Sequence, residues 1–200
     1  MPRNYLFTRE QIVENGLNLV REKGFESLTA RSLGERMNSS SKPIFSLFKN
    51  MDELKQEIIS EADKLYQSYI QKEMNSGKYP PYKASGMAYI HFAKKEKELF
   101  KLLFMRNRRN ENIKEGAEMK HIIPVIQKNT GLSEKDAKLF HMEMWIYVHG
   151  IASMIATDYL DLDEIIVSQM ISDIYNGMRI FYSDRNNMTI MEETWKQSKQ

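Results

Sequence analysis

Residues 28–51 read LTARSLGERMNSSSKPIFSLFKNM, and this stretch decides the fold of the chain. Thr29 is a typical N-cap residue, and Leu33 and Met37 follow at a spacing that places both on the inner face of a short helix. A polar turn comes next, and Pro43 then stands where the first turn of a helix tolerates proline. Two short helices joined by a polar turn predict a helix-turn-helix, whose second helix enters the major groove of DNA.

The segments on either side of this motif are also predicted to be helical. Thr8 and Gln11 have the spacing of a capping box, apolar residues recur over 12–20, and Gly24 supplies a C-terminal stop. After the motif, Asn50 is an N-cap for a long amphipathic helix that runs to residue 75. Three short helices followed by a long one therefore open the chain.

The remainder of the chain also reads as helix, because its apolar residues recur at spacings of three and four and β-branched alternation is missing. Glycine and proline within 76–82 give the clearest break. The predicted fold class is all-α, with a three-helix DNA-binding domain at residues 1–50 and a helical effector-binding and dimerisation domain at residues 51–200. The helices predicted beyond the break cover 82–95, 96–105, 113–129 with a kink at Pro124, 133–158 and 163–183, followed by a polar tail over 186–200 that frays.

The bulk composition narrows the class of protein without indicating a function. The 200 residues are 42% hydrophobic and 28% charged, which is ordinary for a soluble globular protein, and the net charge of +2 is too small to indicate a nucleic-acid partner by itself. No cysteine is present, which excludes disulfides, thiolate metal sites and a cysteine nucleophile. Neither a signal peptide nor a membrane-spanning run is found, so we expect a cytoplasmic protein with no membrane partner.

Two segments of the sequence resemble the TetR family of transcriptional regulators. Residues 28–37 (LTARSLGERM) are similar to the family's approach to the turn, and residues 40–54 (SSKPIFSLFKNMDEL) are similar to its recognition helix and the start of its linker helix. The resemblance implies a regulator, not an enzyme, that binds a palindromic operator in double-stranded DNA as a homodimer. It further implies a ligand-responsive repressor with an unidentified small-molecule effector and no cofactor.

The sequence departs from the family pattern at four places. Residues 38–40 (NSS) stand where the family usually has glycine-valine-serine, although asparagine can adopt the left-handed conformation that glycine would supply. Phe45 replaces the usual tyrosine and so has no hydroxyl to donate to a phosphate. Leu47 replaces an aromatic residue or histidine, and Met51 replaces a lysine. We therefore predict that the apolar framework is kept and that the DNA contacts differ.

Short polar and basic side chains cluster in and around the predicted recognition helix. Backbone amides at its N-terminus favour a phosphate, and Lys42 can reach either a phosphate or a guanine edge. An N-terminal arm with Arg3 and Tyr5, together with Lys55, can add backbone contacts. The alternative is that all of these are solvated groups on a helical surface. The predicted DNA-binding residues are Thr29, Arg31, Ser39, Ser40, Ser41, Lys42, Pro43, Phe45, Ser46 and Lys49.

Large, adaptable side chains gather in the predicted C-terminal helices. Methionine and aromatic residues suit a pocket that accepts a small lipophilic molecule, and the alternative is that they simply fill the core. The residues predicted to line such a pocket are Tyr89, Phe92, Phe100, Phe104, Met105, Met142, Trp145 and His149.

The helices predicted over 133–158 and 163–183 are apolar on more than one face. Such a helix is either interior or shared with a partner, and two of them at the end of a small protein predict a four-helix interface between two subunits. Gly150 and Ser153 lie on one stripe of the first of these helices, where small side chains allow two backbones to approach closely.

No catalytic or metal-binding constellation is found in the sequence. The four histidines, at 91, 121, 141 and 149, lack the spacing of a helical ligand pair and are not accompanied by a carboxylate cluster. There is no nucleophile elbow or phosphate loop. An all-helical enzyme and a protein-interaction module remain as alternatives, and specific, salt-sensitive binding to palindromic DNA would separate a regulator from both.

Overall fold

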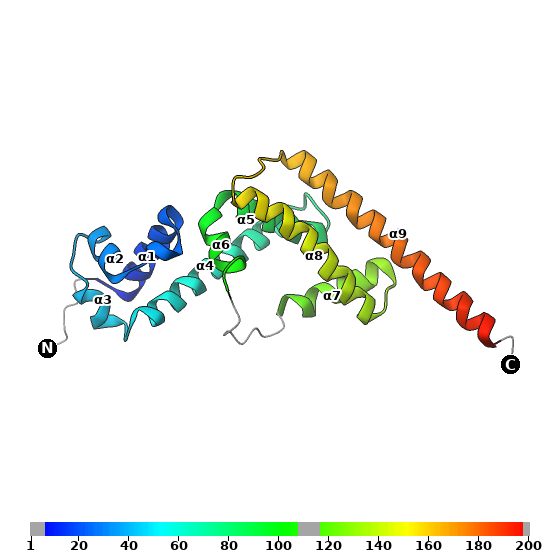
Figure 1. The fold of residues 1–200 in the computed structure, drawn as a ribbon, viewed down its shortest axis with the longest axis horizontal. Helices are drawn as coiled ribbons and strands as arrows, with labels where there is room; N and C mark the ends of the chain where they lie inside the picture. The colour runs from blue at the N-terminus through cyan, green and yellow to red at the C-terminus, as the bar shows by residue number, and fades with distance from the viewer. Residues whose placement is uncertain (1–6, 108–116, 198–200) are drawn as a thin grey trace.

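The computed structural model describes residues 7–107 and 117–197, and every regular element in these ranges is a helix (Figure 1). The helices within residues 9–47 form a small N-terminal body, the helix over 51–75 leads away from it, and the helices within 81–197 form a larger body. The predicted all-α class with two helical parts is therefore confirmed. No helix in these ranges combines the length and the hydrophobicity that a membrane span needs.

The N-terminal body consists of three helices and a short 3₁₀ turn: α1 (Arg9–Lys23), η1 (Phe25–Ser27), α2 (Ala30–Arg36) and α3 (Lys42–Leu47). Thr8 caps α1 in the predicted capping box, and Gly24 ends it at φ +79°, a conformation that favours glycine. Ile12, Leu33 and Ile44, one from each helix, are fully buried in a common apolar core. Burial of these side chains fixes the position of α3 relative to α1 and α2.

Helix α4 (Met51–Asn75) connects the two bodies (Figure 1). Its N-cap is Asn50, whose side-chain oxygen accepts a hydrogen bond from the amide of Glu53 at 2.9 Å. Ile58 is fully buried under α1, where a Cβ on Gly16 would collide with the Ile58 side chain. Further along, Tyr66 is buried against aromatic rings of α5. One helix thus belongs to the cores of both bodies.

The C-terminal body consists of five helices: α5 (Pro81–Lys95), α6 (Lys97–Phe104), α7 (Ala117–Thr130), α8 (Glu134–Ala156) and α9 (Glu164–Gln197). Helix α5 is its centre, because it packs against both α4 and α8, and Met87, Ala88 and Phe92 of α5 are buried there. Helix α9 crosses α8 and then runs away from the rest of the body (Figure 1).

The observed helices follow the predicted ones except towards the C-terminus. The helix predicted over 113–129 is described from Ala117, with Pro124 inside it, and residues 113–116 lie outside the described ranges. The prediction that the last helix ends at 183 and that the tail frays is wrong, because α9 continues to Gln197. No glycine or proline follows Gly177 in α9, so no residue there interrupts the backbone hydrogen bonds of a helix.

Candidate DNA-binding and ligand-binding sites

The turn between α2 and α3 is held by close backbone contacts. Asn38 has φ +49°, the left-handed conformation that its side chain tolerates. The amide of Ser39 then donates to the carbonyl of Gly34 at 2.9 Å. A Cβ on Gly34 would lie 3.0 Å from the carbonyl oxygen of Ser39 and 3.1 Å from the carbonyl carbon of Ser40, so the turn can approach α2 only because position 34 is glycine. Gly34 was not among the residues predicted to matter, although a glycine inside so short a helix is a usable signal.

Helix α3 buries one side and exposes the other. Ile44 and Phe48 are 0% and 2% exposed, and they hold α3 onto the N-terminal core. Phe45 is 51% exposed, and Lys42 and Ser46 are exposed as well. These three positions are neighbours on a helix surface, because residues three and four apart share a face. The outer side of α3 therefore carries one cation, one hydroxyl and one aromatic ring.

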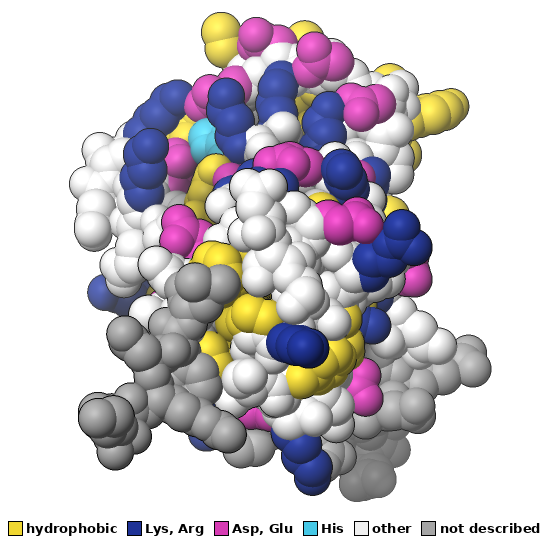
Figure 2. Space-filling view, turned by 90° about the vertical axis from the view of Figure 1, so that its left-hand side faces the viewer, with side chains coloured by type: hydrophobic (Ala, Val, Ile, Leu, Met, Phe, Trp, Pro, Cys, Tyr) yellow, Lys and Arg dark blue, Asp and Glu magenta, His cyan; other side chains and the backbone are white. Residues whose placement is uncertain are grey.

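The cations near the turn differ in whether a carboxylate neutralises them. Arg31 lies 2.9 Å from Glu35 on the same helix. Neither Lys42 nor Lys49 forms an ion pair with a residue in the described ranges, and Lys55 lies 5.5 Å from the centre of an aromatic ring in η1. Figure 2 looks towards this end of the molecule, and basic side chains are interspersed there with acidic ones. Lys42 and Lys49 thus keep ammonium groups that a phosphate can neutralise.

Two other predicted contact residues already have local hydrogen bonds. The Thr29 hydroxyl accepts from the amide of Ser32 at 3.1 Å and so caps α2, as predicted. The Ser46 hydroxyl donates to the carbonyl of Lys42 at 2.9 Å. Arg3 and Tyr5 lie outside the described residues. The remaining predicted residues lie in the turn or at the start of α3: Ser39, Ser40, Ser41 and Pro43.

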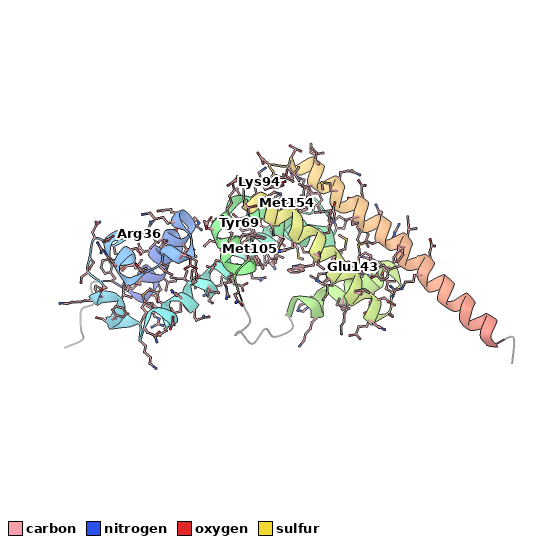
Figure 3. All side chains as sticks on the ribbon, in the orientation of Figure 1. Arg36, Tyr69, Lys94, Met105, Glu143 and Met154 are labelled. Carbon is pink, nitrogen blue, oxygen red and sulfur yellow. The ribbon has the colours of Figure 1, made fainter. Side chains whose placement is uncertain are left out.

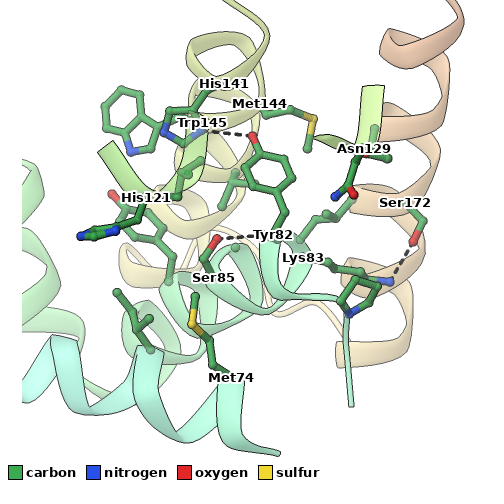
Figure 4. A pocket seen from close by; sticks show the side chains of 18 of the residues that line it. Met74, Tyr82, Lys83, Ser85, His121, Asn129, His141, Met144, Trp145 and Ser172 are labelled. Carbon is green, nitrogen blue, oxygen red and sulfur yellow. Dashed lines mark hydrogen bonds between the residues drawn. The ribbon is translucent and has the colours of Figure 1, made fainter. Parts of the chain in front are cut away.

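A cavity of about 800 Å³ lies between helices of the C-terminal body and α4 (Figure 4). Small-molecule sites typically span about 300–1,000 Å³, with a mainly apolar wall and a few polar groups. The aromatic part of the wall is formed by Tyr66, Tyr82, Tyr89, Phe104, Trp145 and Tyr175. The polar part includes Lys83, Asn129, His141, Ser172 and Arg179.

Part of this wall consists of residues predicted from the sequence. Tyr89, Phe104 and Trp145 line the cavity. Tyr66 from α4 and Lys83 from the start of α5 also line it and were not predicted. No local signal marks these two residues, because the cavity forms where helices from distant parts of the sequence meet.

The other predicted pocket residues do not line this cavity. Phe92 and Phe100 are fully buried in the core, whereas Met105 and Met142 are 43% and 56% exposed at the surface. Met105 directly follows α6 and is labelled in Figure 3. His149 lies behind the wall, and its Nδ1 is 2.8 Å from the hydroxyl of Tyr89, which lines the cavity. Core, surface and cavity residues share the same helices, so helical spacing alone does not separate them.

Two tyrosine–histidine pairs support the cavity wall. The Tyr82 hydroxyl lies 3.1 Å from Nδ1 of His141, and the Tyr89 hydroxyl lies 2.8 Å from Nδ1 of His149. Burial lowers the pKa of both histidines and raises the pKa of Tyr82, because it disfavours the charged forms. Both imidazoles are therefore neutral near pH 7. No three potential metal ligands come together among the side chains that the structure describes.

Large apolar side chains are exposed on α8 and α9, and we call this region the α8–α9 surface. Ile146 and Met154 of α8 are 58% and 42% exposed (Met154 is labelled in Figure 3), and Ile166 and Phe181 of α9 are 52% and 60% exposed. Nothing lies within 4 Å of the position that a Cβ would take on Gly150. An apolar surface of this kind often marks an interaction site.

The three short helices, the close turn and the exposed outer side of α3 define a protein of the helix-turn-helix class with a helical C-terminal body. Residues 82–171 match the family model of the tetracyclin repressor-like C-terminal domain. The crystal structure of a TetR-like transcriptional regulator from Rhodococcus sp. RHA1 is similar to this chain. That match has a TM-score of 0.62 and 12% sequence identity, and it covers 90% of this chain and 96% of that chain.

A search of curated proteins gives no match. The family model covers nearly all of α5, then α6 to α8 and the start of α9, whereas the similar solved structure covers 90% of the chain. Residues 82–171 are thus similar to a tetracyclin repressor-like C-terminal domain, and the fold of the chain is that of a TetR-like regulator, as the sequence predicted.

Proposed function

We propose that this chain is a ligand-responsive repressor that binds a palindromic operator as a homodimer. The observation that carries the proposal is the outer side of α3. Ile44 and Phe48 anchor this helix, and Lys42 projects from it without a carboxylate partner in the described ranges. Its ammonium group can neutralise a phosphate or donate to a guanine edge without breaking an ion pair.

The predicted contact residues are not equivalent in this proposal. Lys42, Phe45 and Lys49 are exposed and take the main contacts. Arg31 has to leave Glu35 before it can bind a phosphate, and this exposed pair is a weak one, so the exchange is feasible. A protein that binds an operator has to share a compartment with the DNA, and the expected cytoplasmic location agrees with this requirement.

We infer that the homodimer forms through the α8–α9 surface. Covering exposed apolar side chains such as Ile146 and Phe181 is favourable, and Gly150 leaves room for a partner helix. The C-terminal part of α9 also runs beyond the body of its own chain (Figure 1). A two-fold dimer repeats each contact and presents two copies of α3, which suits a palindromic operator.

We infer that ligand response passes through α6. Phe104 at one end of α6 lines the cavity. At the other end, Glu96 accepts from the Arg21 guanidinium of α1 at 2.6 Å. A ligand that binds better to one position of α6 therefore shifts the position of the N-terminal body, since a ligand favours the state that it binds more tightly.

The proposal is tested by selecting random-sequence DNA with the purified protein and sequencing the bound fraction. We expect an inverted repeat whose half-sites lie one helical turn apart, about 34 Å, or a multiple of it. Compounds that fit the cavity should then release the selected DNA. Selection without an enriched repeat would contradict the regulator and favour a protein-interaction module or an enzyme.

A further inference from the structure

The wall of the cavity carries basic side chains and, among the residues that the structure describes, no acidic one. Lys83 and Arg179 line it, whereas aspartate and glutamate are absent from this described wall. The whole chain holds 27 acidic residues against 29 lysines and arginines. The whole chain thus has nearly equal numbers of acidic and basic residues, whereas the charged residues of the described cavity wall are all basic.

Lys83 is the cation best placed to meet a ligand. It is half-buried, and its Nζ donates to the Ser172 hydroxyl at 2.8 Å, which occupies one of its three protons. No carboxylate in the described ranges pairs with it. Lys78, five residues earlier, instead lies 2.5 Å from a carboxylate oxygen of Glu164. The Lys83 Nζ also lies 5.0 Å from the centre of the Tyr79 ring. Lys83 therefore keeps two donors, and no carboxylate in the described part of the protein neutralises its charge.

Lys83 and the aromatic ring of Trp145 lie at different sides of the cavity. Figure 4 shows Lys83 and Ser172 on one side and Trp145 on the other. The rings of Tyr89 and Phe104, which also line the cavity, have their centres 4.7 Å apart. The cavity thus has a cationic end and an aromatic end, which suits a ligand with two chemically different parts.

Ligand binding displaces water from the Lys83 ammonium, and the free-energy cost of this desolvation depends on the charge of the ligand group that takes its place. An ammonium group that loses water without gaining a partner is unfavourable, so a neutral ligand is poorly matched to this end of the cavity. A cationic ligand meets Lys83 and Arg179 without a carboxylate from the described wall to offset the repulsion. An anionic group gains charge-assisted hydrogen bonds from Lys83. The Ser172 hydroxyl already donates to the carbonyl of Ser168 at 3.1 Å, so its part is to position Lys83.

We infer that the cavity binds an amphipathic anion, a small molecule with an apolar, ring-containing body and one carboxylate, sulfate or phosphate group held by Lys83. This inference rests on the proposed ligand-responsive function and names the chemical class of the ligand at that site. The anionic group lies at the α5–α9 side, and the apolar body packs against Trp145, Tyr89 and Phe104.

The test uses three fluorescent probes with the same body and different head groups: pyrenebutanoate, pyrenebutanol and pyrenebutylammonium. Their affinities for the full-length protein are measured by fluorescence anisotropy. We expect pyrenebutanoate to bind at least about tenfold more tightly than the alcohol, and the ammonium probe to bind least. Lys83→Gln should weaken binding of the butanoate about tenfold and leave the alcohol unchanged. Lys78→Gln, which removes a nearby paired lysine, should change neither affinity.

Equal affinities for the three probes would overturn the inference, and so would an unchanged butanoate affinity in a Lys83→Gln protein whose circular dichroism matches the wild type. Failure of all three probes to bind the folded protein would overturn it as well. DNA selection contains no probe, so it reports on the proposed function separately. A protein that prefers the butanoate but enriches no inverted repeat would support this inference and contradict the regulator.

Discussion

Lys42 and Phe45 lie side by side on the outer side of α3, and they offer DNA different chemistry. Lys42 supplies a charge without an ion-pair partner in the described ranges, whereas Phe45 supplies a ring that is 51% exposed. A phenyl ring has no donor for a phosphate oxygen, while the tyrosine usual in TetR-type recognition helices has one. Adding one hydroxyl group at position 45 therefore tests whether the outer side of α3 lies next to a phosphate.

We expect Phe45→Tyr to bind the selected operator about three- to tenfold more tightly than the wild type, because one added hydrogen bond contributes about 0.5–1.5 kcal/mol. The salt dependence of binding should not change, because no charge is added. Fluorescence anisotropy with labelled operator measures both quantities, and Phe45→Leu is the control that keeps apolar bulk without a ring. Weaker binding of the tyrosine variant would instead place the ring against an apolar group such as a thymine methyl.

His141 makes stability depend on pH. Burial lowers the pKa of His141 in the folded state, while the unfolded chain binds a proton at its ordinary pKa of about 6.5. The stabilising contribution is complete above about pH 6.5 and is lost as the pH falls towards the lowered folded-state pKa. We expect Tm to decrease between about pH 7.5 and about pH 5.5, and to decrease less in His141→Asn. The same decrease in both proteins would show that His141 does not contribute.

At the scale of elements, the helix-turn-helix depends on the close approach of its turn to α2. Gly34 allows this approach, and its neighbours are backbone atoms of Ser39 and Ser40 that cannot move without shifting the turn. The helical position alone would favour alanine over glycine by up to about 1 kcal/mol. The steric conflict between an alanine Cβ and the turn destabilises the fold, and we expect this effect to be larger than the gain in helix propensity.

Gly34→Ala should therefore lower the free energy of unfolding by about 1–3 kcal/mol, as overpacking of a close contact does. Urea denaturation followed by circular dichroism measures this change. Glu35→Ala is the matched control on the same helix, because it removes only an exposed ion pair and should change stability by less than about 1 kcal/mol. A Gly34→Ala protein as stable as the wild type would show that the turn yields without strain.

The elements of the N-terminal body can be predicted from the sequence, whereas the cavity cannot. The caps at Thr8 and Thr29 and the left-handed Asn38 depend on residues within one turn of the chain, so their signals are local. The cavity depends on how α4, α5, α8 and α9 meet. Phe92 therefore has the chemistry of a lining residue but belongs to the core, and Lys83 lines the cavity without any pattern that marks it.

At the scale of the whole molecule, the α8–α9 surface determines whether two recognition helices act together. Gly150→Leu places a large side chain where the chain itself has open space, so the monomer should fold normally. In a dimer the bulk enters the crossing twice, at about 1–3 kcal/mol for each site. We expect light scattering to show a monomer and operator binding to be lost.

Asp63→Leu is the control for this experiment, because it adds the same side chain at an exposed position of α4. It should leave both the dimer and the operator affinity unchanged. A Gly150→Leu protein that remains a dimer with normal operator affinity would place the subunit interface elsewhere on the molecule.

The central claim is that α3 reads an operator, and the salt dependence of operator binding by the wild type, Lys42→Ala and Lys72→Ala tests it most directly. We predict that affinity falls steeply as salt rises. Lys42→Ala should weaken binding by about 1–3 kcal/mol, which is about 5- to 150-fold, whereas Lys72→Ala on the far part of α4 should bind like the wild type. Binding that is insensitive to salt and unchanged in Lys42→Ala would contradict the claim.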